Sequence, residues 1–147
     1  MASSYTYDGN DNLTGVTDGN GGTYTYEYDE LDRLIKEVSA MGRVQEYRYD
    51  ALGNLTKYKD PLELITEYEY DAAGNLVKEI SPKSLETLYG YDKHGNVTSV
   101  TDPLGYAWQA VYDKDDWMTR RTDALGRSEN WTYDADGRVV AYTNKKG

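Results

Sequence analysis

A Tyr-Asp pair recurs along this chain at a constant interval of 21 residues. The pairs begin at Tyr7, Tyr28, Tyr49, Tyr70, Tyr91, Tyr112 and Tyr133, with no insertion or deletion between them. A repeat of this size is one supersecondary unit, which buries its apolar face by stacking on its neighbours. We therefore expect a single array over residues 1–147, with six full repeats and a partial repeat at each end.

Each repeat contains two turn signals. The first follows the Tyr-Asp pair, as in DALG from Asp50 to Gly53, and the second comes ten residues later, as in DPLG from Asp102. Asp, Asn or Ser at the first place can bond backbone amides, and Gly at the fourth place tolerates a left-handed conformation. A type I turn followed by such a residue is a common hairpin connection. The last of these signals is NKKG, which begins at Asn144.

The segments between the turns indicate strands. They are six or seven residues long, too short for helices, and rich in Thr, Val, Tyr and Ile. The predicted fold is all-β, with about thirteen strands in an antiparallel meander of tandem 21-residue β-hairpins. A sheet of this size tends to curl, so we expect it to be curved or spiralling.

Tyrosine is concentrated at two places in each repeat. We call the tyrosine of the Tyr-Asp pair position one; position twenty, two residues before the next pair, is nearly always aromatic. Residues two apart leave a strand on the same face, so the tyrosines should form two rows over successive hairpins. The chain has sixteen tyrosines and no phenylalanine, so its interior rings carry hydroxyl groups that should find hydrogen-bond partners. The interior is therefore expected to be thin and partly wet. The candidate structural residues are Tyr7, Asp8, Tyr28, Asp29, Tyr49, Asp50, Tyr70, Asp71, Tyr91, Asp92, Tyr112, Asp113, Tyr133 and Asp134, with Tyr26, Tyr47, Tyr68, Tyr89 and Trp131 at position twenty.

The strand register can be predicted only in part. A bulge at the glycine turn would place Tyr49 opposite Leu55, which is apolar at the same position in every repeat. Strict alternation would then turn Lys36, Lys57 and Lys78 toward the tyrosines. Either a second bulge intervenes or the lysine stems pass the rings.

One repeat departs from the aromatic pattern. Ala110 occupies position twenty, and Trp108 lies two residues earlier on the same face. We expect the large indole ring to fill the space beside the alanine.

The unit YDALGNLTKYKDPLELITEYEYD resembles the YD repeat, also called the RHS repeat, of bacterial Rhs proteins, wall-associated proteins, insecticidal toxin complexes and animal teneurins. The match covers nearly the whole chain, and DPLG at 102–105 adds to it. The resemblance implies hairpins joined in a long sheet that winds into a hollow shell. In Rhs proteins and toxin complexes the shell encloses a C-terminal toxin, and in teneurins it is an extracellular scaffold. The chain itself shows neither a toxin segment nor a plug or autoprotease motif, so it looks like part of a shell wall in a secreted or surface-displayed parent.

Composition argues against several other functions. A net charge of −10 repels phosphate, which disfavours nucleic-acid binding. No basic amphipathic helix is evident, and no apolar run approaches the ~20 residues that span a bilayer, so we expect no membrane insertion. The start, MASSYTYDG, lacks the charged and apolar regions of a secretory signal, and without cysteine there is neither a disulfide nor a thiolate.

No catalytic, cofactor or metal site is predicted. The single histidine, His94, lies in a turn and is interpreted as a solvated turn residue. DGNDN from Asp8 and DKDD from Asp113 offer clustered oxygens, but the EF-hand pattern fails because Leu13 and Gly19 occupy its sixth and twelfth places. The chain is therefore expected not to be an enzyme.

Three kinds of partner are expected. The chain itself is one, because a sheet with two cut edges and an aromatic face invites association with another copy. The resemblance adds a toxin cargo in the full-length parent. It also leaves a glycan as an alternative ligand, since YD repeats have been linked to carbohydrate binding and the tyrosine rows could act as a platform for sugar rings.

Overall fold

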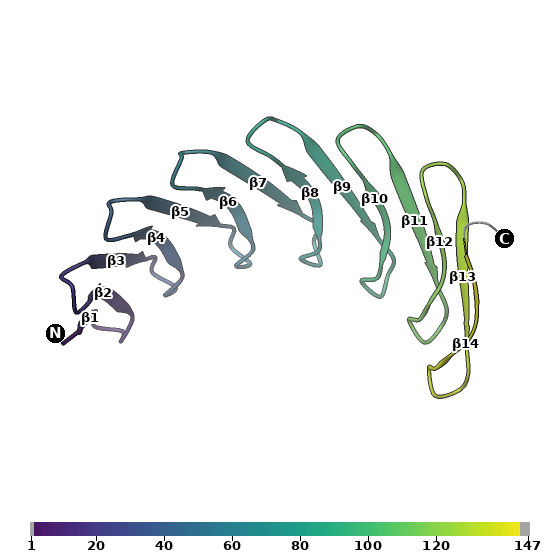
Figure 1. The fold of residues 1–147 in the computed structure, drawn as a ribbon, viewed down its shortest axis with the longest axis horizontal. Helices are drawn as coiled ribbons and strands as arrows, with labels where there is room; N and C mark the ends of the chain where they lie inside the picture. The colour runs from purple at the N-terminus through teal and green to yellow at the C-terminus, as the bar shows by residue number, and fades with distance from the viewer. Residues whose placement is uncertain (1, 145–147) are drawn as a thin grey trace. The chain divides into compact units, whose positions relative to one another are not determined.

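A computed structural model describes residues 2–144, which form fourteen β-strands and contain no helix (Figure 1). The all-β prediction is confirmed, with one strand more than the expected thirteen because both partial repeats contribute to the sheet. Strand order follows chain order from β1 to β14, and every pair with a defined register is antiparallel. In these described residues, no helix is long and apolar enough to cross a membrane.

The chain divides into two compact units, residues 1–68 and 69–147, with the division inside β7. The first unit contains β1 (Ser4–Tyr7), β2 (Leu13–Thr17), β3 (Thr23–Tyr28), β4 (Leu34–Val38), β5 (Val44–Tyr49), β6 (Leu55–Lys59) and the greater part of β7 (Ile65–Tyr70). The second contains β8 (Leu76–Ile80), β9 (Glu86–Tyr91), β10 (Val97–Thr101), β11 (Ala107–Tyr112), β12 (Met118–Thr122), β13 (Ser128–Tyr133) and β14 (Val139–Thr143).

The first turn of each repeat has the predicted geometry. In the β5–β6 turn, the Gly53 amide donates to the Asp50 carbonyl at 3.2 Å, and the Asp50 amide donates to the Asn54 carbonyl at 2.9 Å. Gly53 has φ +92°, in the left-handed region that follows a type I turn in this kind of hairpin. Asp32 and Asp116 adopt the same conformation where the repeat has aspartate in place of glycine, as expected.

The second turn of each repeat repeats this arrangement. Gly105 has φ +84°, and its amide donates to the Asp102 carbonyl at 2.9 Å. Glu63 and Ser84 hold the left-handed place without being glycine, at φ +63° and +58°. The turn expected from Asn144 lies outside the described residues except for Asn144 itself.

A bulge beside the first turn, present in each such hairpin with a defined register, sets which side chains share a face. Tyr49 pairs with Leu55 as predicted, and the register shifts between Arg48 and Tyr49. One residue of β6, Thr56, is therefore left without an opposite partner, and Lys57 pairs with Arg48. This extra residue turns the lysine column away from the tyrosines, which decides between the two alternatives that the sequence left open.

The interior is thin, as the composition suggested. Ala110, at 5% exposed, is the only hydrophobic residue classed as buried in the described part of the chain, and no side chain there is fully buried. The position-one tyrosines from Tyr28 to Tyr133 are half-buried, whereas Tyr5 and Tyr7 are more than half exposed. Burial therefore comes mainly from rings that cover neighbouring hairpins, and a deep core is absent from residues 2–144.

Candidate functional site

Position-one tyrosines in both units link their hairpin to the preceding one. The hydroxyl of Tyr49 donates to the carbonyl oxygen of Leu34, which is 15 residues earlier, at 2.9 Å. The same bond joins Tyr28 to Leu13, Tyr91 to Leu76, Tyr112 to Val97 and Tyr133 to Met118, at 2.7–3.0 Å. Sequence analysis predicted a hydroxyl partner but did not identify the carbonyl.

These bonds require a protonated tyrosine. Burial, the main cause, raises the pKa of Tyr91 and Tyr112 above the ordinary value of 10.0, and the nearby carboxylates of Asp71 and Asp92 add to it. A raised pKa keeps the hydroxyl as a donor throughout the neutral range. Tyr91 and Tyr112 thus make neutral hydrogen bonds between their hairpins and the preceding ones.

Position twenty forms a second aromatic row, and its cross-strand partners were not predicted. The rings of Tyr47 and Tyr58 lie 5.4 Å apart, and those of Trp131 and Tyr142 lie 5.5 Å apart. Each pair sits directly opposite in the ladder, a position in which aromatic pairs stabilise sheets. Tyr58 is three residues after Leu55, so strict alternation would place the two side chains on opposite faces. The bulge between them brings both to the same face, and for that reason the pairing could not be read from the sequence.

The aspartate of each Tyr-Asp pair holds the turn together. Asp50 Oδ1 accepts the amides of Leu52 and Asn54, both at 2.9 Å, and Oδ2 accepts the Asn54 side-chain amide at 2.9 Å. These bonds favour the ionised form, with the side-chain bond from Asn54 the largest cause, and lower the pKa of Asp50 below 3.8. Asp71 accepts the equivalent bonds from Ala73 and Asn75, and its pKa is lowered for the same reason.

Asp8 shows why the oxygen-rich turns do not resemble a calcium loop. Its Oδ1 accepts the amides of Asn10 and Asn12 at 2.9 Å, and its Oδ2 accepts the Asn12 side chain at 3.1 Å. The carboxylate is therefore directed into its own turn. Asp113 likewise accepts the amides of Asp115 and Trp117.

Arg33 adds a second link between hairpins in the first unit. Its Nε donates to Asp29 Oδ2 at 2.7 Å, and its Nη1 donates to the Asp50 carbonyl at 2.8 Å. The guanidinium carbon lies 4.9 Å from the centroid of the Tyr49 ring, within cation–π range. Arginine at this place in the turn thus bonds its own hairpin and the next one.

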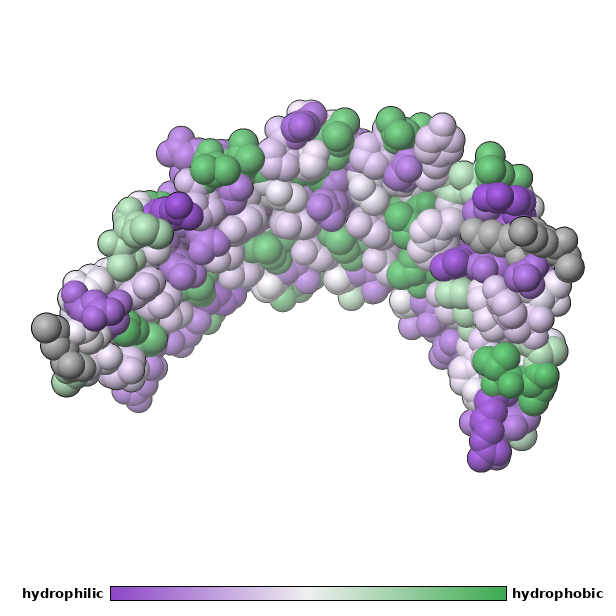
Figure 2. All heavy atoms as spheres, in the orientation of Figure 1, coloured by the Kyte–Doolittle hydropathy of each residue, from purple (hydrophilic) through white to green (hydrophobic). Residues whose placement is uncertain are grey.

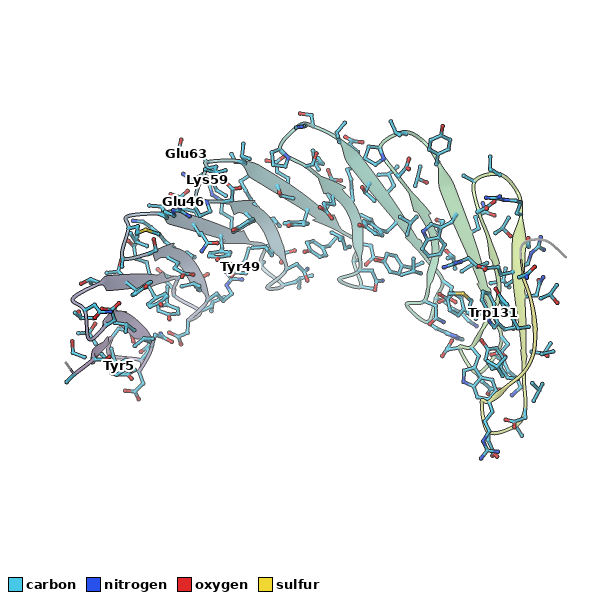
Figure 3. The ribbon with its side chains drawn as sticks, viewed as in Figure 1. Tyr5, Glu46, Tyr49, Lys59, Glu63 and Trp131 are labelled. Atoms are coloured by element: carbon cyan, nitrogen blue, oxygen red, sulfur yellow. The ribbon has the colours of Figure 1, made fainter. Side chains whose placement is uncertain are left out.

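The opposite face of the sheet carries cross-strand ion pairs. Lys59 contacts Glu46 at 3.0 Å, and Figure 3 shows both side chains on the other side of the ribbon from Tyr49. Lys36 binds Glu27 at 2.7 Å, and Lys78 binds Glu69 at 3.1 Å. Because these ion pairs are open to solvent, each contributes little to stability, so this face is principally a hydrophilic surface.

Apolar residues occupy the exposed tips of the second turns, a feature the sequence analysis missed. Hydrophobic side chains gather over the β6–β7 turn in the first unit and over the β10–β11 turn in the second (Figure 2). The third residue of these turns is 72–80% exposed, at Met41, Leu62, Leu104 and Leu125. The signal was present as the recurring leucine of DPLG and DALG.

The structure also brings His94 close to two aspartates. His94 Nδ1 lies 2.7 Å from Asp116 Oδ1, and the side chains of Asp92, His94 and Asp116 form a group of metal-ligand type. His94 is an exposed turn residue, as the sequence indicated, but it is not isolated from other ionisable groups.

Comparison with known proteins places this geometry in a family. The model of the teneurin YD-shell matches residues 1–125, and that of the RHS repeat matches residues 112–147. No curated protein sequence matches the chain.

Several solved toxin-complex structures share the fold. A crystal structure of TcdB2-TccC3 without its hypervariable C-terminal region superposes with a TM-score of 0.75 at 18% identity, over 97% of this chain and 9% of that one. A Tc holotoxin pore from Photorhabdus luminescens gives 0.73 at 18% identity, over 95% and 9%. TcdB2-TccC3-TEV gives 0.72 at 17% identity, over 94% and 8%.

The chain therefore spans less than a tenth of these toxin-complex chains. At this identity the likeness shows the fold, and the family-model match over 125 of 147 residues shows the family. The chain belongs to the teneurin YD-shell family, whose repeats are structural.

Proposed function

We propose that this chain is a structural wall module, one continuous array of YD repeats within a larger shell. In the parent protein, the shell would encapsulate a C-terminal toxin or be displayed at the cell surface. A secreted or surface-attached parent follows from the family. The tyrosine and aspartate pairs are then structural residues, which join hairpins and hold turns.

The tyrosine–carbonyl bond between successive hairpins carries this proposal. It recurs in both units with the same 15-residue separation, so each added repeat makes the same contact as the one before. An array of this kind can be extended by further repeats, because each one forms the same interface with its neighbour. That property suits a wall, whose purpose is to cover area.

Protease protection in the full-length parent tests enclosure. The segment that follows the repeats should be cut slowly while the array is folded, and rapidly after the array is unfolded in urea. The repeats themselves serve as the control for protease activity, because they should also be cut only in urea. Equal cutting rates for the following segment in both conditions would contradict encapsulation.

We also propose that the module has no enzymatic activity. The families it matches are structural shell repeats, and the aspartates of its turns accept backbone amides. Incubation of the chain with peptide and glycoside substrates should give rates equal to those of buffer. Turnover that persists through a second, independent purification step would overturn this point.

Self-association is a further part of the proposal. All of β14 is exposed, and Val139, Val140 and Tyr142 are each more than half exposed. Exposed apolar edge strands pair readily with other strands. Light scattering should show a mass that rises with concentration, and Val140→Lys should reduce that rise; a constant monomer mass in the wild-type chain would contradict it.

Carbohydrate binding is the alternative function. A depression in the first unit is lined by Tyr47, Tyr49, Asp29 and Arg33 among others, and rings with polar groups beside them are suited to sugars. A glycan array read out by tyrosine fluorescence tests this alternative. Binding that is lost in Tyr47→Ala would support it, and no response at millimolar glycan would remove it.

A further inference from the structure

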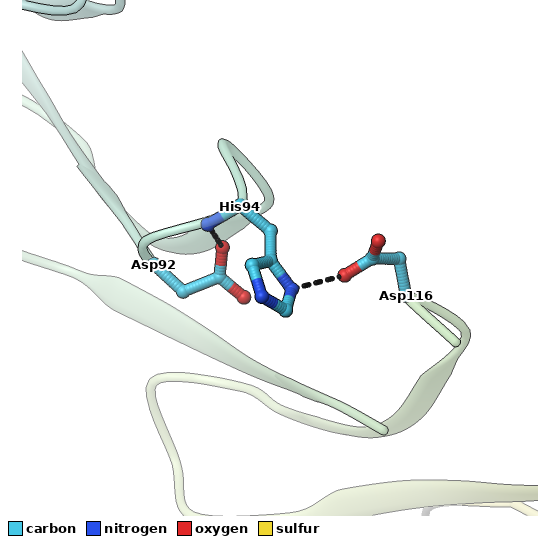
Figure 4. A group of neighbouring side chains, drawn as sticks. All are labelled: Asp92, His94 and Asp116. Carbon is cyan, nitrogen blue, oxygen red and sulfur yellow. Dashed lines mark hydrogen bonds and ion pairs between the residues drawn. The ribbon is translucent and has the colours of Figure 1, made fainter. Parts of the chain in front are cut away.

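We propose that Asp92, His94 and Asp116 form a binding site for a transition-metal dication of the Zn²⁺ class. The three side chains come from two successive first turns in the second unit, β9–β10 and β11–β12 (Figure 4). One ligand atom from each lies within 4.8 Å of the others. The site would join neighbouring hairpins, because Asp92 and Asp116 are 24 residues apart in the chain.

The donor atoms select the class of metal. An imidazole nitrogen with two carboxylate oxygens suits Zn²⁺, Cu²⁺ and Ni²⁺, whereas Ca²⁺ prefers six to eight oxygens. Zinc bonds to nitrogen and oxygen are about 2.0–2.2 Å long, which places neighbouring tetrahedral ligands roughly 3.3 Å apart. His94 Nδ1 and Asp116 Oδ1 are 2.7 Å apart, so they need to separate by only about 0.6 Å.

The side chains are able to make that movement. His94 and Asp116 are 42% and 49% exposed, so neither is held by packing on all sides. The amide of Asn96 donates to Asp116 Oδ1 at 2.7 Å and to Asp92 Oδ2 at 3.2 Å, so both carboxylates already converge on one electropositive group. Asp92 Oδ1 stays bound to the backbone amides of His94 and Asn96, so Asp92 would bind the metal through Oδ2. A cation there would take the place of the Asn96 side-chain amide on both carboxylates. The net charge of −10 further favours its approach.

The first unit contains the same arrangement without the imidazole. There Asn10 Nδ2 donates to Asp32 Oδ1 at 2.9 Å, and Asn12 Nδ2 donates to the same oxygen at 2.6 Å. Asn10 thus takes the place of His94, Asn12 that of Asn96, and Asp8 and Asp32 those of the two aspartates. This pair of turns is an internal control, because it keeps the carboxylates and differs in the residue that would supply the nitrogen ligand.

The experiment exchanges the residues at the two equivalent places, His94 and Asn10, in the untagged full chain. Each variant is titrated with ZnCl₂ in a calorimeter. The wild-type chain should bind one Zn²⁺, His94→Asn should bind none, and Asn10→His should bind two. Asp116→Gly should weaken binding at least about tenfold, and glycine at this position is already accommodated at Gly95. CaCl₂ should bind at least about 100-fold more weakly than ZnCl₂.

His94 also provides a spectroscopic readout, because it is the only histidine in the sequence. Its imidazole resonances should shift on addition of Zn²⁺ and remain unchanged on addition of Ca²⁺. The proposal is overturned if the wild-type chain shows no stoichiometric binding at about 100 µM Zn²⁺, if His94→Asn retains binding, or if Asn10→His gains no second site. Circular dichroism of each variant should match the wild-type spectrum, since asparagine and glycine occur at the equivalent places in other repeats.

Discussion

The hydroxyl of Tyr49 donates a hydrogen bond to the carbonyl oxygen of Leu34, one hairpin earlier in the chain. Leu34 in turn lies opposite Tyr28, whose own hydroxyl reaches back to Leu13. Leu34 thus meets one tyrosine through the ladder and another through its carbonyl. Adjacent repeats are coupled at a fixed point, which is what a wall built by repetition requires.

Backbone strain at the turns is testable by a pair of opposite substitutions. Gly53 has φ +92° and open space where a Cβ would lie, so Gly53→Ala should cost about 1–2 kcal/mol through backbone strain alone. Gly9 in an equivalent turn also has open space but no left-handed φ, so Gly9→Ala should be neutral or slightly stabilising. Urea melts compare the two; equal effects would show that the left-handed place is not strained.

The converse change should stabilise the chain. Glu63, in the turn between β6 and β7, holds the left-handed place at φ +63° (Figure 3). Glu63→Gly relieves that strain but makes the unfolded chain more flexible, so the net gain should be about 0.5–1 kcal/mol. A loss of stability in urea melts would mean that the glutamate side chain makes a stabilising contact.

Acid should destabilise the array through its turns. The pKa of Asp50 and that of Asp71 are lowered from 3.8 by bonds that need the carboxylate ionised. The contribution of these bonds to folding stability is complete above pH 3.8, the ordinary pKa. It is lost as the pH falls through the lower pKa values of the two aspartates in the folded chain. Urea melts between about pH 6 and pH 2.5 should show this loss, and Asp50→Asn should make it smaller. If the stability of Asp50→Asn falls with acid as much as that of the wild-type chain, Asp50 does not contribute to the acid sensitivity.

Alkali should destabilise it through the tyrosine row. The folded-state pKa of Tyr91 and that of Tyr112 lie above 10.0, chiefly because of burial, so the unfolded chain ionises first. The contribution of these tyrosines to folding stability is complete below about pH 10. It is lost as the pH rises through their higher pKa values in the folded chain. Ultraviolet titration should show a late-titrating class of tyrosines that disappears in urea. A single class at the ordinary value in folded protein would contradict the burial argument.

The Trp108 substitution tests how the chain accommodates Ala110. Ala110 is only 5% exposed, although most other repeats have a tyrosine at its position. Trp108 is half-buried on the same face of β11. Trp108→Ala should cost about 2–4 kcal/mol, somewhat less than for a fully buried tryptophan. Trp108→Tyr should recover part of the loss. A loss below about 1 kcal/mol in urea melts would rule out volume compensation.

Much of this fold could be predicted from sequence because its signals are local. The turn at Asp50 to Gly53 needs only the chemistry of its own residues, and the pairing of Tyr49 with Leu55 follows from that turn. The lysine column could not be placed, because the extra residue at Thr56 belongs to the ladder and has no residue signature of its own. Threonine at this place looks like any other strand residue.

Contacts between repeats were harder to foresee than contacts within one. A tyrosine hydroxyl was expected to find a partner, but its reach to Leu34 depends on the stagger of two hairpins. The proximity of His94 to Asp116 has the same origin, since the two turns are adjacent only when the repeats stack. In the sequence, Asp92 lies two residues before His94, but Asp116 is 22 residues away, so the group of three cannot be recognised there.

The most direct test of the account is the removal of a single hydroxyl from the tyrosine row. Tyr49→Phe keeps the ring and leaves the Leu34 carbonyl without its donor, so it should cost about 1 kcal/mol of unfolding free energy in urea. Tyr112→Phe, which loses the bond to Val97 in the second unit, should cost about the same. Tyr106 is 58% exposed, and Tyr106→Phe should change stability by less than about 0.5 kcal/mol. If the two row variants are as stable as Tyr106→Phe, the tyrosine–carbonyl bond does not join the hairpins, and the central claim is wrong.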